Sequence, residues 1–327
     1  MPISTTYSPN APAARTGQGS AISNREDLSN ELTLLAPEET PLLSLCGKGT
    51  AKSTFSEWTA DKLAAPVTTG ISEGTDVTSF SDQFAQRARL GNYVQIFRRD
   101  FLVSNLQQAV NSVGPANIAQ AEAKAMRELK RDVEARICSN SDRSVEDGAG
   151  TPYALRGLGD WLDSAGPADV PAAYRTPAAS IASSAPNETT FNDIIASIFS
   201  VNGEANSLTL IANVALRKVI SNFTRSSGAA ASEAVYRVSQ NAEAKKVTHS
   251  VQMYDSDFGI VKIINGNPDC MTGASGFVVN PSYLQFNTLI PMGATRLENQ
   301  GGGERGFVDM TGTLVCKHPG AHGKITV

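Results

Sequence analysis

The stretch that decides the fold is residues 54–104, TFSEWTADKLAAPVTTGISEGTDVTSFSDQFAQRARLGNYVQIFRRDFLVS. Its two ends have the composition of β-strands, whereas its middle is rich in Ala, Pro, Thr, Gly, Ser and Asp. The tip, residues 64–82, has only Val67, Ile71, Val77 and Phe80 as sizeable apolar side chains, too few to bury a core against the entropy of ordering the chain. We therefore predict a long β-hairpin that projects from a domain and needs a neighbouring surface to lie on.

The second arm of this hairpin is apolar on both faces near its base. In a strand, Tyr93, Gln95 and Phe97 point to one face, and Val94 and Ile96 point to the other. Because neither face is wholly polar, we expect the hairpin to be rooted in the body of the protein.

Composition allows a globular protein of two or more subdomains. The chain has 327 residues, of which 41% are hydrophobic, and a net charge of −4. Lys and Arg are spread along the chain, so the sequence has no basic patch that would predict binding to a nucleic-acid backbone. The first 23 residues have neither a basic region nor an apolar run, which predicts no signal peptide, no membrane anchor and an intracellular protein.

No motif predicts a catalytic, cofactor or metal site. Gly301, Gly303 and Gly306 have the G-x-G-x-x-G spacing of a dinucleotide-binding loop. Such a loop is followed by a helix, whereas the segment that follows here is strand-like. Asp255 and Asp257 are predicted to mark a strand end or turn. The remaining candidates are the two histidines of HPGAHGK, predicted to be exposed in a turn, and four unpaired cysteines predicted to be packing thiols: His318, His322, Cys46, Cys138, Cys270 and Cys316.

The segments outside the hairpin predict an arm, a long helix and a mixed domain. Residues 1–24 lack periodicity, and a short amphipathic piece with Leu28, Leu32 and Leu35 follows. A four-residue apolar repeat predicts one helix from about 115 to 138, with Pro115 in its first turn. Its charged face has the pairs Lys124–Glu128 and Lys130–Glu134, and is either solvated or an interface.

Residues 142–187 are dominated by Gly, Ala, Pro and Ser and predict a long connection. Its one anchor is GLGDWL, where Leu158, Trp161 and Leu162 can pack beneath a loop. The chain after this connection predicts a helix that ends near Gly203, a buried strand SLTLIAN and a helix VALRKVISNFT. Strands are predicted at AVYRVSQ, VTHSVQMYDSD, FGIVKIINGN, SGFVVNP, GATRLENQ and GFVDMTGTLVCK.

The order of these parts resembles that of tailed-bacteriophage major capsid proteins with the Hong Kong ninety-seven fold. The resemblance is carried by APEETPLLSLCGKGTAKSTFSEWTADKL, RLGNYVQIFRRDFLVS, LKRDVEARI and DSDFGIVKI, and covers most of the chain from Asn24 onward. It implies an α+β fold with an N-terminal arm at 1–48 and an extended β-hairpin loop at 49–95. It also implies a peripheral domain at 96–150 and 276–327, which holds the spine helix, and an axial domain at 151–275.

The resemblance implies a non-enzymatic major capsid protein that self-assembles into an icosahedral head enclosing double-stranded DNA, with no cofactor. Its implied partners are copies of itself in pentamers and hexamers, together with portal, scaffolding and decoration proteins and non-specifically adjacent DNA, but no membrane. It implies assembly in the host cytoplasm and a final place in the virion. Two alternatives stay open: an encapsulating nanocompartment that binds cargo protein, and a soluble hydrolase or ligand-binding protein with a site in residues 142–187.

Contacts between subunits are predicted at the hairpin and the arm. Trp58 is the expected anchor, because aromatic residues dominate interface hot spots. Tyr93 and Phe97 are further candidates, with packing inside the chain as an equal alternative. Some relatives cross-link through a hairpin lysine; Lys62 is the only lysine well inside this hairpin, but the sequence shows no partner for it, so we do not predict a cross-link. The arm contributes Leu28, Leu32 and Leu35.

Overall fold

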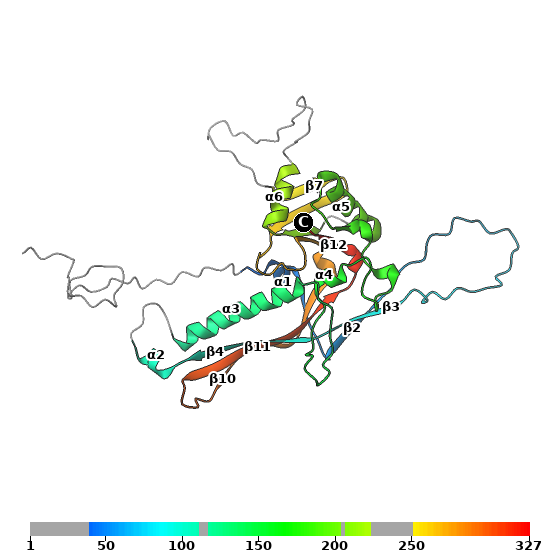
Figure 1. Cartoon of the computed structure of the whole chain (residues 1–327). Coiled ribbons are helices and arrows are strands. Elements are labelled where there is room, and N and C mark those ends of the chain that lie inside the picture. The colour runs from blue at the N-terminus through cyan, green and yellow to red at the C-terminus, as the bar shows by residue number, and fades with distance from the viewer. Residues whose placement is uncertain (1–38, 111–116, 204–206, 224–250) are drawn as a thin grey trace, which may run out of the picture.

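The computed structural model describes residues 39–110, 117–203, 207–223 and 251–327. Within these ranges the chain mixes helices with strands in three sheets, of four, six and two strands (Figure 1). The shorter helices are α1 (Pro41–Leu45), α2 (Asn105–Ala109) and α4 (Leu158–Trp161), with 3₁₀ turns at Ala172–Tyr174, Ala178–Ser180, Pro281–Tyr283 and Pro319–Ala321.

The four-stranded sheet carries the long helix α3 along one face (Figure 1). Its strand order is β1-β10-β11-β4, with β1 parallel to β10 and the other pairs antiparallel. Bulges interrupt β10 near Pro291, where a residue without an N–H cannot continue the ladder. The strands are β1 (Gly47–Thr50), β4 (Gln95–Val103), β10 (Leu284–Leu297) and β11 (Glu304–Cys316).

Helix α3 (Ile118–Ile137) is the predicted spine helix. Asn117 caps its first turn by accepting a hydrogen bond from the N–H of Gln120 at 3.0 Å. The predicted four-residue repeat forms its buried face, at Ala125, Leu129, Val133 and Ile137. Its 20 residues span about 30 Å. The helix begins three residues later than predicted, and Pro115 lies outside the described residues.

One of the two predicted charged pairs on α3 is present and the other is not. Lys124 Nζ lies 3.8 Å from Glu128 Oε1. Glu134, predicted to pair with Lys130 on the outer face, is only 1% exposed and accepts hydrogen bonds from backbone groups of α1. The prediction failed because four-residue spacing places two side chains near each other but does not say which face of the helix is covered.

The six-stranded sheet forms a second core with helices α5 and α6. Its order is β5-β12-β9-β6-β8-β7, and all five residues of β6 are buried. Helix α5 ends at Gly203, whose φ of 71° is the left-handed conformation that glycine adopts without strain, as the sequence predicted. The elements are β5 (Ile181–Ala182), β6 (Leu208–Ala212), β7 (Met253–Ser256), β8 (Gly259–Asn265), β9 (Gly276–Val279), β12 (Gly323–Ile325), α5 (Glu188–Asn202) and α6 (Val214–Phe223).

The two cores do not follow the order of the chain. Strands β9 and β12, which lie in the predicted peripheral segment 276–327, pair within the six-stranded sheet. Leu158 and Trp161, which lie in the predicted axial segment 151–275, pack in one core with the spine helix. The strand predicted at AVYRVSQ lies outside the described residues. The predicted domain boundaries stay a prediction.

The hairpin is paired only at its base, which differs from the long ribbon that we predicted. β2 (Phe55–Ala60) pairs with β3 (Ala88–Tyr93), and residues 61–87 between them form no strand. The second arm divides at Val94, because β4 after it joins the four-stranded sheet. Val94 is 2% exposed and Ile96 is 59% exposed, so these two residues do not share one environment as a single continuous strand would require.

His322 is fully buried, which corrects the prediction of an exposed turn. Its Nδ1 accepts a hydrogen bond from the N–H of Asn280 at 3.1 Å, and Nε2 has no hydrogen-bond partner among the described residues. Burial, and secondly the charge of His318, lower the pKa of His322 to about 3. The Gly- and Pro-rich turn is covered because it leads into β12, inside the six-stranded sheet.

We predict that His322 makes the subunit lose stability as the pH falls from about 6.5 toward about 3. In this window the unfolded state binds a proton at this residue and the folded state does not, so the free energy of unfolding falls by roughly 1.4 kcal/mol per pH unit. We would measure the free energy of unfolding with urea at several pH values across this range. It should fall less steeply with falling pH in His322→Gln than in the unaltered protein. An unchanged slope in the variant would contradict the prediction.

Candidate functional site

The base of the hairpin is held to the body by aromatic packing. Leu90 in β3 is buried, and across from it the ring of Trp58 has its centroid 5.7 Å from that of Trp161 in α4. At the other end of the pair, the ring centroids of Phe55 and Tyr93 are 4.5 Å apart. Such ring pairs contribute about 0.5–1.5 kcal/mol each beyond the area they bury.

The loop at residues 61–87 extends away from this base (Figure 1). Arg87 Nε lies 2.9 Å from Asp61 Oδ2 at its neck, but both side chains are about half exposed and the pair contributes less than about 1 kcal/mol. Six large apolar side chains of the loop are each at least 60% exposed. In a soluble protein such a surface indicates contact with another molecule. They are Leu63, Val67, Ile71, Val77, Phe80 and Phe84.

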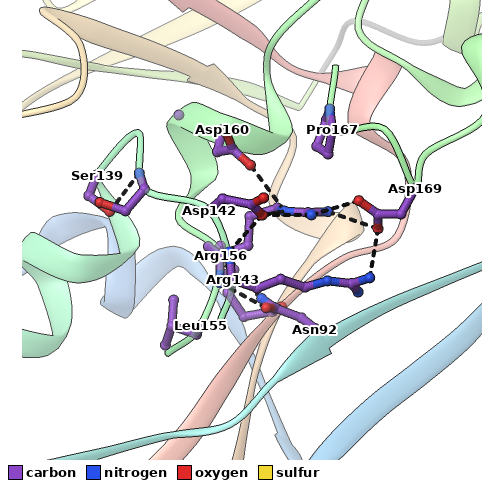
Figure 2. A network of polar contacts seen from close by, with 12 residues as sticks. Asn92, Ser139, Asp142, Arg143, Leu155, Arg156, Asp160, Pro167 and Asp169 are labelled. Carbon is purple, nitrogen blue, oxygen red and sulfur yellow. Dashed lines mark hydrogen bonds and ion pairs between the residues drawn. The ribbon is translucent and has the colours of Figure 1, made fainter. Parts of the chain in front are cut away.

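A buried arginine joins the base of the hairpin to the chain that follows α3 (Figure 2). The side chain of Arg156 is 1% exposed and lies among Asp142, Asp160 and Asp169. Its Nη2 is 2.7 Å from an oxygen of Asp142 and 2.7 Å from an oxygen of Asp169. Its Nη1 donates to the second oxygen of Asp169 at 3.2 Å. Asp169 therefore receives a two-point bond, one of the stronger polar contacts in proteins.

Arg143 extends this arginine network to the hairpin itself (Figure 2). Its Nη2 lies 3.1 Å from Asp169 Oδ2, and its Nη1 donates to the carbonyl oxygen of Gly91 in β3. Its guanidinium carbon lies 5.0 Å from the ring centroid of Phe55 and 5.7 Å from that of Tyr93. Asp169 thus bridges an arginine in the body and an arginine that holds the hairpin.

Asn92 completes the connection, because its buried amide bonds to two other segments. Its Oδ1 accepts from the N–H of Arg156 at 2.8 Å, and its Nδ2 donates to the carbonyls of Arg156 at 3.3 Å and Leu314 at 2.8 Å. The adjacent Gly91 has no room for a side chain, since a Cβ would lie 2.5 Å from the Phe55 ring. The direction in which the hairpin leaves the body is therefore set by specific bonds.

The three carboxylates around Arg156 differ in their pKa values and in how strongly they bind the guanidinium. Burial works against the charge of Asp169, but the hydrogen bond and the charge of Arg156 outweigh it and lower the pKa of Asp169. Burial, and secondly the charge of Asp142, raise the pKa of Asp160. Asp160 Oδ2 lies 3.0 Å from Arg156 Nε without a hydrogen bond, because Nε donates its single hydrogen to Asp142. Asp160 is the weakly held member of the network.

The predicted contact residues lie in different environments. Trp58 and Tyr93 are partly buried at the base of the hairpin, and Lys62 is exposed at the start of the loop. Phe97 is 5% exposed and belongs to the core of the subunit. This is the alternative given for it in the sequence analysis, packing inside the chain. Leu28, Leu32 and Leu35 lie outside the described residues.

Sequence reasoning missed the arginine network. Residues 142–169 read as a connection, and the spacing from Arg156 to Asp142 or Asp169 matches neither helix nor strand periodicity. One signal was available: Arg156 stands two residues before Leu158, in the anchor segment that the sequence did identify. A buried anchor with charges beside it predicts that some of those charges are paired.

The candidate residues for chemistry have the following places in the described parts of the chain. The described residues hold no group of three or more His, Cys, Asp or Glu side chains placed to bind a metal ion. A strand, β11, follows the Gly-rich segment, and Asp257 lies in the turn between β7 and β8, both as predicted. All four cysteines are free and buried, as expected of packing thiols, and burial, with the charge of Glu134, raises the pKa of Cys46 to about 12.

None of the described helices is both long enough and apolar enough to pass through a lipid bilayer.

The fold is that of phage capsid subunits. The structure from Gordonia phage Cozz is similar, with a TM-score of 0.58 and 16% identity over 99% of each chain. The capsid of cyanophage P-SCSP1u has a TM-score of 0.58 and 12% identity over 98% of this chain and 99% of that one. The capsid of the native GTA particle has a TM-score of 0.58 and 11% identity over 97% and 100%. These likenesses establish the capsid fold that the sequence predicted.

The chain belongs to the SU10 major capsid protein family, which matches residues 11–327. It is a major capsid protein of a tailed phage, a shell protein of the phage head, and its place is the virion. No curated protein sequence matches it.

We predict that Arg156→Met destabilises the subunit by about 3–5 kcal/mol, because three carboxylates then face one another without the buried cation. Arg156→Lys should cost less, since it keeps the charge but loses the two-point bond. Urea unfolding of the free subunit measures both.

A matched control is Arg296→Met, which breaks an exposed pair with Glu122 and should cost less than about 1 kcal/mol. Equal losses for Arg156→Met and Arg296→Met would refute a supporting role for the arginine network.

Proposed function

We propose that this protein assembles into an icosahedral head around double-stranded DNA, through rings of five and six subunits, and acts without catalysis. The observation that carries the proposal is the loop at residues 61–87, whose six large apolar side chains are exposed in the free subunit. A surface that one subunit leaves open can be covered by a second subunit in a closed symmetric shell.

Covering these side chains would contribute favourably to assembly. Burying a side chain the size of Ile71 or Phe80 contributes about 1.5–3 kcal/mol. Each subunit in a shell both covers a neighbour and is covered by one, so modest contacts add up through multivalency. The arginine network supports this role, because a hairpin with a fixed direction loses less entropy when it binds.

The proposed contact residues at the hairpin are those with exposed surface, and those of the arm are proposed from the sequence. Trp58 and Tyr93 offer partly exposed rings at the base of the hairpin, and Lys62 lies at the start of the loop. Phe97 forms no part of this surface. In the proposed arm at residues 1–48, the contacts are Leu28, Leu32 and Leu35. The other proposed parts of the subunit are the hairpin loop (49–95), the peripheral domain (96–150 and 276–327) and the axial domain (151–275).

Further proposed partners are portal, scaffolding and decoration proteins, with packaged DNA held without sequence preference. Assembly is proposed to take place in the host cytoplasm. The rival nanocompartment would be recognised by cargo protein that copurifies with the shell. The rival hydrolase or ligand-binding protein would have its site in residues 142–187, where Leu158, Trp161 and Leu162 are buried in the core of the subunit.

We predict that Phe80→Asp stops or strongly slows shell formation but leaves the subunit folded. Phe80 is 89% exposed, so its replacement costs the free subunit less than about 0.5 kcal/mol. An interface that buries this ring would instead have to bury a charge. Sedimentation velocity with electron microscopy measures assembly, and thermal unfolding measures the subunit.

The neighbouring Ser81→Asp is the control, because it adds the same charge to the exposed loop without removing an apolar ring. Shell formation by Phe80→Asp at the rate of the unaltered protein would contradict the proposed role of the loop.

A further inference from the structure

The short helix α1 lacks the means to hold its own position. It has five residues, too few for a helix that is stable alone. Thr40 at its N-terminus makes no side-chain capping bond, so the first N–H groups of the helix need acceptors from elsewhere. Leu42 is fully buried, and Leu43 and Leu45 pack partly buried against the same core, but this apolar packing leaves the N–H groups of the first turn without acceptors.

Glu134 of the spine helix supplies the missing acceptors. Its Oε1 accepts the N–H of Leu42 at 2.8 Å, and its Oε2 accepts the N–H of Leu43 at 2.8 Å. Both bonds are charge-assisted, and a carboxylate that uses both oxygens fixes a partner in position and in angle. Since Glu134 is 1% exposed, water does not compete for these oxygens.

Asn267 holds the same segment from a second direction. Its Nδ2 donates to the carbonyl oxygen of Glu39 at 3.0 Å, and its Oδ1 accepts from the N–H of Asp269 at 3.0 Å, which orients the amide. Asn267 follows β8 in the six-stranded sheet, whereas Glu134 lies in the helix on the four-stranded sheet. The start of α1 is therefore held by both parts of the fold.

A buried carboxylate is a costly way to hold a helix. Burial raises the pKa of Glu134 in spite of its two backbone bonds. Apolar residues of similar volume are often as stable as a buried charge, so a buried charge is better explained by the one arrangement that it selects. Here it selects one placement of α1 along the spine helix.

We infer that Glu134 is a positioning residue for shell assembly, which sets the point and direction at which the proposed N-terminal arm leaves the body of the subunit. The inference rests on the proposed role of the arm in contacts between subunits. It concerns a different residue and a different segment from the hairpin contacts, and its first test is made on the free subunit.

The first test measures amide hydrogen exchange in the free subunit. In Glu134→Leu the N–H groups of Leu42 and Leu43 both lose their acceptor, and both should exchange at least tenfold faster than in the unaltered protein. Glu134→Gln keeps one acceptor oxygen, so one of the two amides should keep most of its protection. Glu128→Gln is the control, because Glu128 lies on the same helix in a pair with Lys124 and should leave both amides unchanged.

The second test compares assembly of the same variants by sedimentation velocity and electron microscopy. The expected result is fewer regular shells and more irregular particles in the order Glu134→Leu, Glu134→Gln, Glu128→Gln, with the last equal to the unaltered protein. Unchanged amide protection in Glu134→Leu would overturn the anchoring of α1. Lost protection with normal shells would overturn the role in assembly. If Glu134→Leu does not fold, the graded pattern in Glu134→Gln decides.

Failure of this inference is distinguishable from failure of the proposed function. If the unaltered protein forms no shells, the proposed function fails while the exchange test on the free subunit still reports on Glu134. If the unaltered protein forms shells and the Glu134 variants form them equally well, only the inference fails.

Discussion

The guanidinium of Arg156 has no access to water, so it requires carboxylates on several sides. Three aspartates surround it, and one of them, Asp169, also binds Arg143, which holds the backbone of the hairpin at Gly91. Satisfying one buried cation therefore fixes the chain after the spine helix and the base of the hairpin together. The rest of the contact surface depends on this, because a projecting loop reaches a neighbour only if its base points in a defined direction.

The same physical device recurs with the opposite sign in the last turn of the spine helix. Glu134 is a buried anion satisfied by two backbone N–H groups, and it ties α1 to the spine helix. At the points where the hairpin and the proposed arm leave the body, polar bonds add to the packing of Trp58 and Leu42 and set the direction of the chain. Apolar burial then remains available for contacts with neighbours. Phe80 and Ile71 illustrate this, since both are more than 80% exposed in the free subunit.

Much of the fold was predictable because its signals are local. The repeat from Ala125 to Ile137 predicted the spine helix, and the Gly203 stop predicted the end of α5. The exposure of the loop followed from its shortage of apolar side chains. Three features were not predictable from local pattern: the break at Val94, the burial of His322 and the inward turn of Glu134. Each depends on which distant segment covers the residue, and periodicity carries no such information.

The sequence by itself determined that the segment near residues 61–87 cannot form a core and that one long amphipathic helix ends near residue 138, and these two conclusions need only composition and spacing. The capsid fold was expected from the resemblance of several sequence motifs, and their order, to a known family. The tertiary structure alone decided which charges are paired around the buried Arg156. Asp142, Arg156 and Asp169 are neighbours in space but have no periodic relation in the chain, so their mutual neutralisation became visible only once the fold had brought them together.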